Sequence, residues 1–176
     1  MTDLPDDLCR SDPDASASDS FPDQAFRRDI VAVLSNPSNA TMLETLCMAT
    51  GLRFAAIARV TDRNWVTCCV VDHLSFGLKP GDELLIETTL CRDVEKSRNE
   101  IVIDDVFSHP VYCDHHTPRD YGFRSYLSFP VYRKDGEFFG TICGLDPEPH
   151  RLNESRVRDM MRLFAKLVGD SLDAGP

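Results

Sequence analysis

The chain has 176 residues, with 29 acidic and 19 basic side chains and a formal net charge of −10. This length fits one domain with tails, and it is enough to bury a stable core without disulfides or structural metals. The acidic balance argues against nucleic acid and anionic membranes as partners, because both carry negative charge themselves. No apolar stretch approaches the length of a membrane span.

The chain contains seven cysteines, an odd number, and no Cys-x-x-Cys spacing. This pattern fits neither a disulfide framework nor a zinc-ribbon site. The N-terminus lacks the apolar stretch after a basic start that marks a secretory signal. We therefore expect free thiols in a reducing, cytoplasmic setting and no bound metal.

Residues 1–22 are rich in Asp, Ser and Pro and poor in large apolar side chains. Such a segment buries too little surface to offset its ordering entropy, so we predict a disordered acidic tail. Apolar residues at helical spacing begin near Asp23, are interrupted at Asn36-Pro37-Ser38, and resume from Ala40 to Thr50. Gly51 is the expected C-terminal stop of this second helix.

The central part of the chain predicts two hairpins separated by short elements and a long connection. The second hairpin is the more clearly marked, because Lys134-Asp135-Gly136 has the Asp-Gly chemistry of a tight turn. The predicted elements, in chain order, are strands at 54–61 and 65–71, an extended piece at 83–86, a helix from Thr88 or Thr89 to about Ser97, a strand at 101–103, a connection at 106–123 that holds a small helix, and strands at 124–133 and 137–145.

A final helix is predicted from apolar residues at 3, 4, 7 spacing, with Asn153 as its N-cap and Gly175-Pro176 at its end. Its inward stripe comprises Val157, Met160, Met161, Phe164, Leu167, Val168 and Leu172. Strands joined by hairpins, with helices at both ends, indicate an α+β domain around an antiparallel sheet. We predict one such domain over residues 23–174.

Four segments carry a resemblance to a known family: the 54–71 hairpin, Val102–Val106, Tyr121–Val131 and Gly136–Pro147. The last two contain a Ser-x-Pro-Val strand that leads into a hairpin and a Gly-x-Ile-x-x-x-Asp strand that returns from it. Over roughly residues 25–173 the chain resembles a GAF domain.

The resemblance implies a central antiparallel sheet of five or six strands, with helices from both termini on one face and a loop-enclosed pocket on the other. GAF domains bind cyclic nucleotides, bilins, haem or other small molecules, and many act beside histidine kinases or cyclases. The Asn-Lys…Phe…Asp-Glu signature of cyclic-nucleotide binders is absent here. We therefore expect a small-molecule-sensing or protein-interacting regulatory module rather than an enzyme, either stand-alone or acting on a separate histidine kinase of a two-component system.

The candidate site is the polar connection that runs into the Ser-x-Pro strand. Tyr126 and Ser128 share parity with Arg124, so all three should lie on one face of that strand. A mixed polar set suits a pocket with a few oriented polar groups, so we place this face toward the pocket. The predicted ligand-binding residues are Asp104, Tyr112, Cys113, Asp114, His115, His116, Tyr121, Arg124, Tyr126 and Ser128.

Several of these residues have more than one interpretation. Arg124 either holds an anionic ligand or pairs with Asp114 or Asp120. The adjacent histidines favour loop capping and pocket lining over a metal site, because no second cluster has metal-ligand spacing. The Asp104-Asp105 pair favours capping and turn formation over catalysis. Cys113 is a thioether anchor, a redox thiol or an inert loop cysteine.

Three alternative functions stay open on the sequence. One is a bilin photoreceptor anchored at Cys113, which lies 17 residues before Pro130. Another is a thiol-dependent free methionine sulfoxide reductase, with Cys113 as nucleophile and Cys91 or Cys143 as the resolving thiol. The third is a domain with a filled pocket that serves only in protein contacts. In each case we expect a homodimer through the terminal helices.

Overall fold

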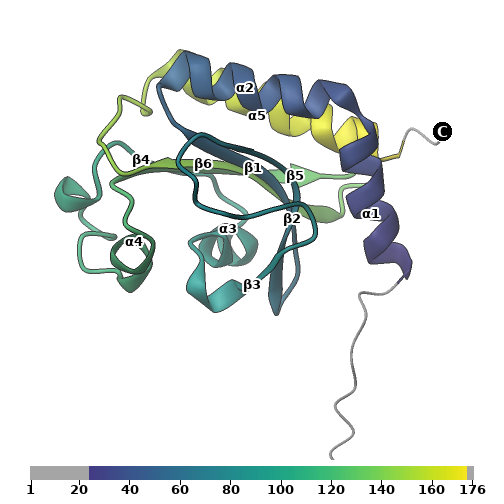
Figure 1. Cartoon of the computed structure of the whole chain (residues 1–176), viewed down its shortest axis with the longest axis horizontal. Helices are drawn as coiled ribbons and strands as arrows, with labels where there is room; N and C mark the ends of the chain where they lie inside the picture. The colour runs from purple at the N-terminus through teal and green to yellow at the C-terminus, as the bar shows by residue number, and fades with distance from the viewer. Residues whose placement is uncertain (1–23, 174–176) are drawn as a thin grey trace, which may run out of the picture.

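The computed structural model describes residues 24–173 (Figure 1). One antiparallel sheet runs through them in the order β3-β2-β1-β6-β5-β4. Its strands are β1 (Phe54–Val60), β2 (Asn64–Asp72), β3 (Glu83–Leu85), β4 (Ile101–Ile103), β5 (Ser125–Tyr132) and β6 (Phe138–Asp146). The predicted α+β class and both predicted hairpins are confirmed. The predicted tail at 1–22 and the Gly175-Pro176 helix end lie outside the described residues, and the domain bounds at 23 and 174 stay predictions.

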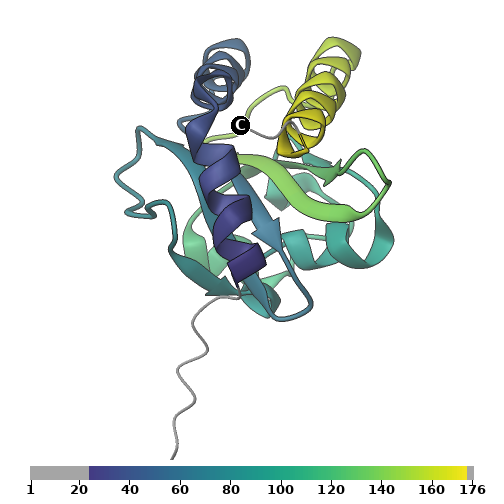
Figure 2. The same ribbon diagram turned by 90° about the vertical axis from the view of Figure 1, so that its right-hand side faces the viewer.

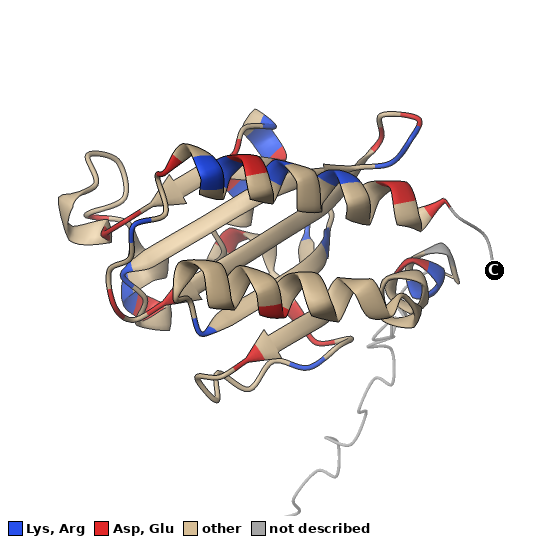
Figure 3. Ribbon diagram, turned by 90° about the horizontal axis from the view of Figure 1, so that it is seen from above, with Lys and Arg blue, Asp and Glu red and all other residues tan. Residues whose placement is uncertain are grey.

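Helices cover both faces of the sheet (Figure 1). Helices α2 (Pro37–Thr50) and α5 (Ser155–Leu172) run along one face, as the view from above also shows (Figure 3). Helix α1 (Gln24–Ser35) turns away from α2 and crosses the sheet near β2 (Figure 2). The opposite face carries α3 (Cys91–Ser97), α4 (His116–Tyr121) and the short turns η1 (Ile86–Thr88) and η2 (Val106–Ser108).

The sheet separates two hydrophobic cores. Because successive side chains of a strand point to opposite faces, β5 sends Leu127 and Phe129 to the core under α2 and α5. The same strand sends Tyr126 to the core under α3 and α4. The helix-side core also holds Leu43 and Met161, which are fully buried. The α3/α4 side is the one on which the sequence predicts a pocket.

Helix α2 begins at Pro37, three residues before the predicted start. Asn36 is its N-cap, and the Asn36 side chain accepts a hydrogen bond from the Ser38 amide. Proline is well suited to the first helical position, because the amide it lacks has no partner there in any case. The predicted stop at Gly51 is confirmed, since Gly51 takes a left-handed conformation (φ 82°) and donates its N–H to Cys47.

Helix α5 begins at Ser155, and the predicted N-cap at Asn153 is wrong. The residue before the helix is Glu154, which makes no side-chain capping bond. The preceding amides of Leu152 and Asn153 instead donate to the carboxylate of Asp104, each at 2.8 Å. A carboxylate 48 residues away in the sequence thus positions the start of α5. Leu167 is also half-exposed rather than part of the buried stripe.

Close backbone approach fixes α5 on the sheet. A Cβ atom added at Gly169 would lie 1.9 Å from the carbonyl oxygen of Tyr132 in β5. A Cβ at Gly140 would lie equally close to the carbonyl oxygen of Ala58 in the neighbouring strand. Both distances are far below van der Waals contact with rigid backbone, so these positions accept only glycine.

We predict that Gly169→Ala lowers the free energy of unfolding by about 2–4 kcal/mol, because the helix must move off β5. Urea denaturation followed by circular dichroism measures this change. The control is Leu163→Ala on the exposed side of the same helix, which should stay within about 0.5 kcal/mol of the parent. Equal effects of the two substitutions would contradict the close packing.

The buried carboxylate of Asp146 ties the end of β6 to the loop before β1. It accepts hydrogen bonds from Arg53 Nε and the Glu148 amide, each at 2.8 Å, and a second Arg53 nitrogen also lies at 2.8 Å. Burial raises the pKa of Asp146, but these hydrogen bonds outweigh it and lower the pKa from 3.8 to about 2. The folded state therefore favours the ionised form.

Because this pKa is depressed in the folded state, the stability it contributes is present above about pH 4 and is lost as the pH falls toward 2. We expect the contribution of Asp146 to the free energy of unfolding to fall by about 2 kcal/mol between pH 5 and pH 2. Asp146→Asn should be less stable at pH 7 and should lose less stability over that interval. Urea denaturation at a series of pH values tests this. If the free energy of unfolding changed with pH in the same way in the parent and in Asp146→Asn, the prediction would be refuted.

Candidate functional site

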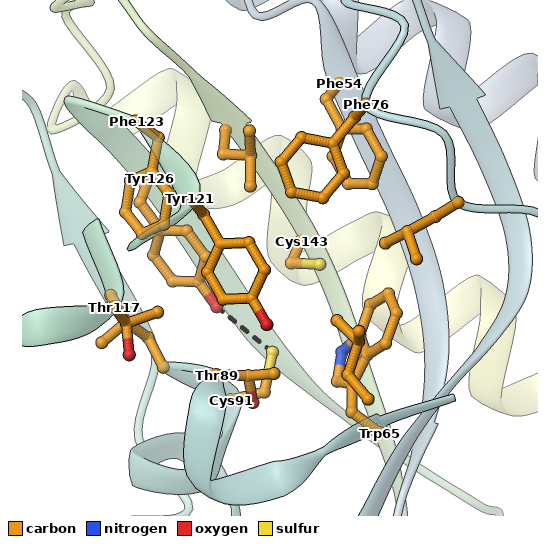
Figure 4. Close-up of a pocket in the computed structure, with 14 residues that line it drawn as sticks. Phe54, Trp65, Phe76, Thr89, Cys91, Thr117, Tyr121, Phe123, Tyr126 and Cys143 are labelled. Atoms are coloured by element: carbon orange, nitrogen blue, oxygen red, sulfur yellow. Dashed lines mark hydrogen bonds between the residues drawn. The ribbon is translucent and has the colours of Figure 1, made fainter. Parts of the chain in front are cut away.

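A small cavity, here named the inner cavity, lies between the sheet and the α3/α4 layer (Figure 4). Its walls are mainly aromatic and aliphatic, and no charged side chain is among the described residues that line it. They are Phe54, Trp65, Phe76, Leu78, Leu84, Thr89, Leu90, Cys91, Thr117, Tyr121, Phe123, Tyr126, Cys143 and Leu145. Of these lining residues only Tyr121 and Tyr126 belong to the predicted ligand-binding set, while Cys91 and Cys143 were named as alternative resolving thiols.

The inner cavity has a volume of about 50 Å³. A water molecule needs roughly 10–15 Å³ by the same measure, so the cavity holds a few molecules of that size. Ligand pockets are commonly about 300–1,000 Å³. An organic ligand therefore requires the surrounding side chains to move.

Two aromatic side chains in the wall of the inner cavity are partly exposed to solvent. Phe76 belongs to the loop after β2, and Tyr121 is the last residue of α4. The centroids of their rings lie 5.8 Å apart, and the Phe76 ring also packs at a tilt against the Phe54 ring, with centroids 5.2 Å apart. The Tyr121 hydroxyl is 3.0 Å from Thr88 Oγ1. Phe76 and Tyr121 are only half-buried, so their rings have room to swing outward into solvent.

Trp65 carries an unpaired polar group in this wall. The side chain is buried, yet its indole Nε1 has no hydrogen-bond partner among the described residues. Figure 4 shows this nitrogen on the side of the ring that faces the cavity. A buried N–H without an acceptor costs about 1–3 kcal/mol, so this donor is available to a molecule that enters.

A cluster of polar side chains surrounds the sulfur of Cys91 at the floor of the inner cavity. The Sγ atom lies 3.2 Å from the Tyr126 hydroxyl, 3.3 Å from Thr141 Oγ1 and 3.6 Å from Ser128 Oγ. Burial raises the pKa of the Cys91 thiol, but hydrogen bonds from Cys143 and the three hydroxyls outweigh it and bring the pKa to about 6. The hydrogen bond to Cys91, together with burial, raises the pKa of Cys143 well above its ordinary value.

A second depression, here named the outer groove, lies on the far side of Phe123. It has a volume of about 360 Å³ and contains three of the predicted site residues, Cys113, His115 and Arg124. Its lining residues are Val106, Phe107, Cys113, His115, Pro118, Arg119, Gly122, Phe123, Arg124 and Pro147. Phe123 lines both spaces. The predicted site residues that line a cavity are thus divided between two places, and Asp104, Tyr112, Asp114, His116 and Ser128 line neither.

Arg124 is held by a partner that the sequence analysis did not propose. Its guanidinium pairs with the Asp105 carboxylate at 2.5 and 3.2 Å, rather than with Asp114 or Asp120. The hydrogen bond from Arg124 lowers the pKa of Asp105. Asp105 also accepts a hydrogen bond from the Phe107 amide, so it caps η2. Arg124 lies just outside β5 and lines the outer groove, whereas Tyr126 lines the inner cavity.

The other predicted residues have structural partners. Asp104 holds the segment before α5, and the Tyr112 hydroxyl donates to Asp93 at 3.0 Å. His115 is the N-cap of α4 and stacks on His116, whose side chain is exposed along with Asp114. Ser128 faces Cys91, on the same side as Tyr126, as its parity predicts. No cluster of three metal-binding side chains occurs within residues 24–173.

The fold and these two spaces define an α+β domain with a candidate ligand chamber on one side of an antiparallel sheet. The family model of the GAF domain matches residues 39–172, and the chain therefore belongs to the GAF domain family. The predicted family is thus confirmed. Within the described part of the chain no helix is long and apolar enough to cross a membrane.

Individual relatives are distant or match only in part. Over 50 residues the sequence is 36% identical to diguanylate cyclase DgcP of Escherichia coli K12. The matched segment covers 28% of this chain and 14% of the cyclase. A GAF domain region of a membrane protein from Geobacter sulfurreducens superposes with a TM-score of 0.64 at 14% identity, covering 86% of this chain and 99% of that one. A type II free methionine-R-sulfoxide reductase from Thermoplasma acidophilum superposes with a TM-score of 0.60 at 15% identity. The match covers 81% of this chain and 94% of the reductase. At such identities the two structures establish the fold alone.

The Arg124–Asp105 pair should hold the η2 turn at the edge of the outer groove. We predict that Arg124→Ala speeds hydrogen exchange of the Phe107 amide several-fold, because Asp105 loses the cation that orients it. The free energy of unfolding should change little, since the pair is partly exposed to solvent, which screens it. Hydrogen exchange followed by NMR measures the first quantity and urea denaturation the second.

Arg119→Ala is the matched control, because Arg119 lines the same groove and forms no ion pair within residues 24–173. The Phe107 amide should exchange at the parent rate in that variant. Identical exchange in both variants would show that the ion pair does not order the turn.

Proposed function

We propose that this GAF domain is a non-enzymatic regulatory module of signal transduction that senses a small molecule in the inner cavity. Support comes from the chamber's place on the sheet face opposite the terminal helices. The observation that carries the proposal is the unpaired indole N–H of Trp65 in an otherwise apolar wall. Most ligand pockets combine such apolar walls with a few oriented polar groups.

The chemistry of the wall defines the ligand. Aromatic and aliphatic side chains without a charged partner suit a compact, uncharged and mostly apolar molecule. Trp65 would donate its N–H to one acceptor, such as a carbonyl oxygen, on that molecule. Phe76 and Tyr121 would swing outward to admit it. The proposed site is therefore the inner cavity and not the outer groove, which Cys113 and Arg124 line.

The same features speak against a bilin as ligand. A tetrapyrrole is far larger than a cavity of about 50 Å³, and its propionate groups need cations that the described lining residues lack. Cys113, the predicted anchor, lines the outer groove instead of the inner cavity. A reductase with Cys113 as nucleophile is also disfavoured. Its resolving thiol, Cys91 or Cys143, lines the inner cavity, on the other side of Phe123 from Cys113.

The terminal helices are the proposed output surface. Large apolar side chains on these helices are exposed to solvent: Val31, Leu34, Met48, Leu163 and Leu167. The view from above shows charged residues spread along α5 and few on α2 (Figure 3). We propose that a second copy of the chain covers this surface, and that a histidine kinase or another signalling protein receives the signal from the dimer.

Trp65 is the only tryptophan of the chain, so its indole N–H gives a single reporter signal in NMR spectra. We predict that benzaldehyde, which carries an acceptor, shifts this signal downfield, while toluene of similar size leaves it nearly in place. Trp65→Phe should weaken benzaldehyde binding about fivefold, as expected for one lost hydrogen bond. Native mass spectrometry of the purified protein would show any retained molecule and the number of subunits.

Leu78→Phe, which narrows the inner cavity, should abolish binding of both probes. Leu85→Phe is the matched control, because Leu85 is exposed in the nearby strand β3 and lines neither the inner cavity nor the outer groove. Absence of probe binding, together with a native mass equal to that of the bare chain, would refute the sensing function. The domain would then serve in protein contacts with a filled pocket.

A further inference from the structure

The environment of Cys91 is unusual for a buried cysteine. Three hydroxyl groups, from Tyr126, Ser128 and Thr141, approach its sulfur, and none of them donates to a carboxylate or a backbone carbonyl in the described part of the chain. A neutral thiol is a weak acceptor that also carries its own proton. Three hydroxyls that converge on one sulfur and have no carboxylate or backbone carbonyl as acceptor in the described part of the chain match a thiolate, because hydrogen bonds to a charged form stabilise that form.

The strand register brings the second thiol to the same place. Cys143 in β6 is paired directly with Ser128 in β5, and it lies two residues from Thr141 on the same face of β6. Cys91 contacts both Ser128 and Thr141, so its sulfur sits over this part of the β5–β6 pair. Figure 4 shows Cys91 and Cys143 extending into the inner cavity from opposite walls.

The other buried cysteines lack such surroundings. Cys47 and Cys68 belong to the helix-side core. Burial raises the pKa of Cys47 to about 11 and that of Cys68 to about 12. The hydroxyl cluster at Cys91 is therefore a local arrangement rather than a general property of cysteines in this fold.

We infer that Cys91 and Cys143 form a redox pair, in which hydrogen peroxide oxidises Cys91 and Cys143 resolves the product to a disulfide. The Cys91 thiolate attacks one peroxide oxygen, the O–O bond breaks, and the departing hydroxide takes a proton from solvent to give water. The Cys143 sulfur then attacks the sulfenic sulfur of Cys91. The S–O bond breaks, a second water forms with the Cys143 proton, and the two thiols have supplied the two electrons that reduce one peroxide.

The size of the inner cavity selects this oxidant. Hydrogen peroxide is only slightly larger than water and fits a space of about 50 Å³. Bulky disulfides such as oxidised glutathione do not fit behind Phe76 and Tyr121. This redox input does not depend on an organic ligand in the cavity, so it can succeed or fail separately from the proposed sensing function.

The test is oxidation of the full, reduced chain by increasing hydrogen peroxide, followed by alkylation in denaturant and peptide mass spectrometry. Cleavage after glutamate separates Cys91 (residues 88–95) from Cys143 (residues 138–154, because the Glu148–Pro149 bond resists cleavage) and from Cys113. We expect a Cys91–Cys143 disulfide that dithiothreitol reverses, formed at least tenfold faster than oxidation of Cys68. In Cys143→Ser, dimedone should trap Cys91 as a sulfenic acid.

Two further variants separate the redox role from a packing role. Tyr126→Phe keeps the ring but removes one donor, so the pH profile of Cys91 alkylation by iodoacetamide should move to higher pH while Cys113 is unaffected. Cys68→Ser, at a buried cysteine of the other core, should leave Cys91–Cys143 oxidation unchanged. The inference is overturned if Cys91 stays reduced at peroxide concentrations that oxidise the exposed Cys113, or if its pH profile is the same in Tyr126→Phe.

Discussion

The alternation of side chains along β5 and β6 is the constraint on which the rest of the domain depends. It sends Leu127 and Phe129 to one core and Tyr126 and Ser128 to the other, within a single strand. A register slip of one residue would exchange these sets and place hydroxyl groups under the helices. Glycine at position 140 reinforces the register, because only glycine allows β6 to approach the Ala58 carbonyl this closely. The inner cavity, the Cys91 cluster and the helix-side core all follow from this one pairing.

Much of the fold could be predicted because its signals are local. Alternation over 54–71 and 124–145, with turn residues between the strands, identified both hairpins. Parity within β5 also predicted correctly that Tyr126 and Ser128 share the pocket side. The errors at helix starts were of another kind. Pro37 can interrupt a helix or begin one, and which of these occurs depends on the Asn36 side chain that caps it.

The site was predicted less well, because its contacts join residues far apart in the sequence. Arg124 has acidic neighbours at Asp114 and Asp120, yet it pairs with Asp105 across the strand end, and Asp104 accepts hydrogen bonds from the segment before α5. The polar cluster around Cys113 was predicted to bind a ligand. Its side chains mostly contact one another: His115 caps α4 and stacks on His116. Cys91 had no such neighbours in the sequence. Its donors come from two strands that begin more than thirty residues later, so only the folded chain reveals them.

In the proposed function a signal from the inner cavity must cross the sheet to reach the terminal helices, and β5 and β6 contribute side chains to both cores. Cys143 faces the cavity while its neighbour Ile142 faces the helix-side core, so a shift of β6 acts on both sides. Helix α5 rests on β5 without an intervening side chain where Gly169 meets the Tyr132 carbonyl. A contact between rigid backbones transmits displacement more directly than flexible side chains do. Under the proposed functions, a change at Cys91, which contacts residues of both β5 and β6, would act on α5 by moving these two strands.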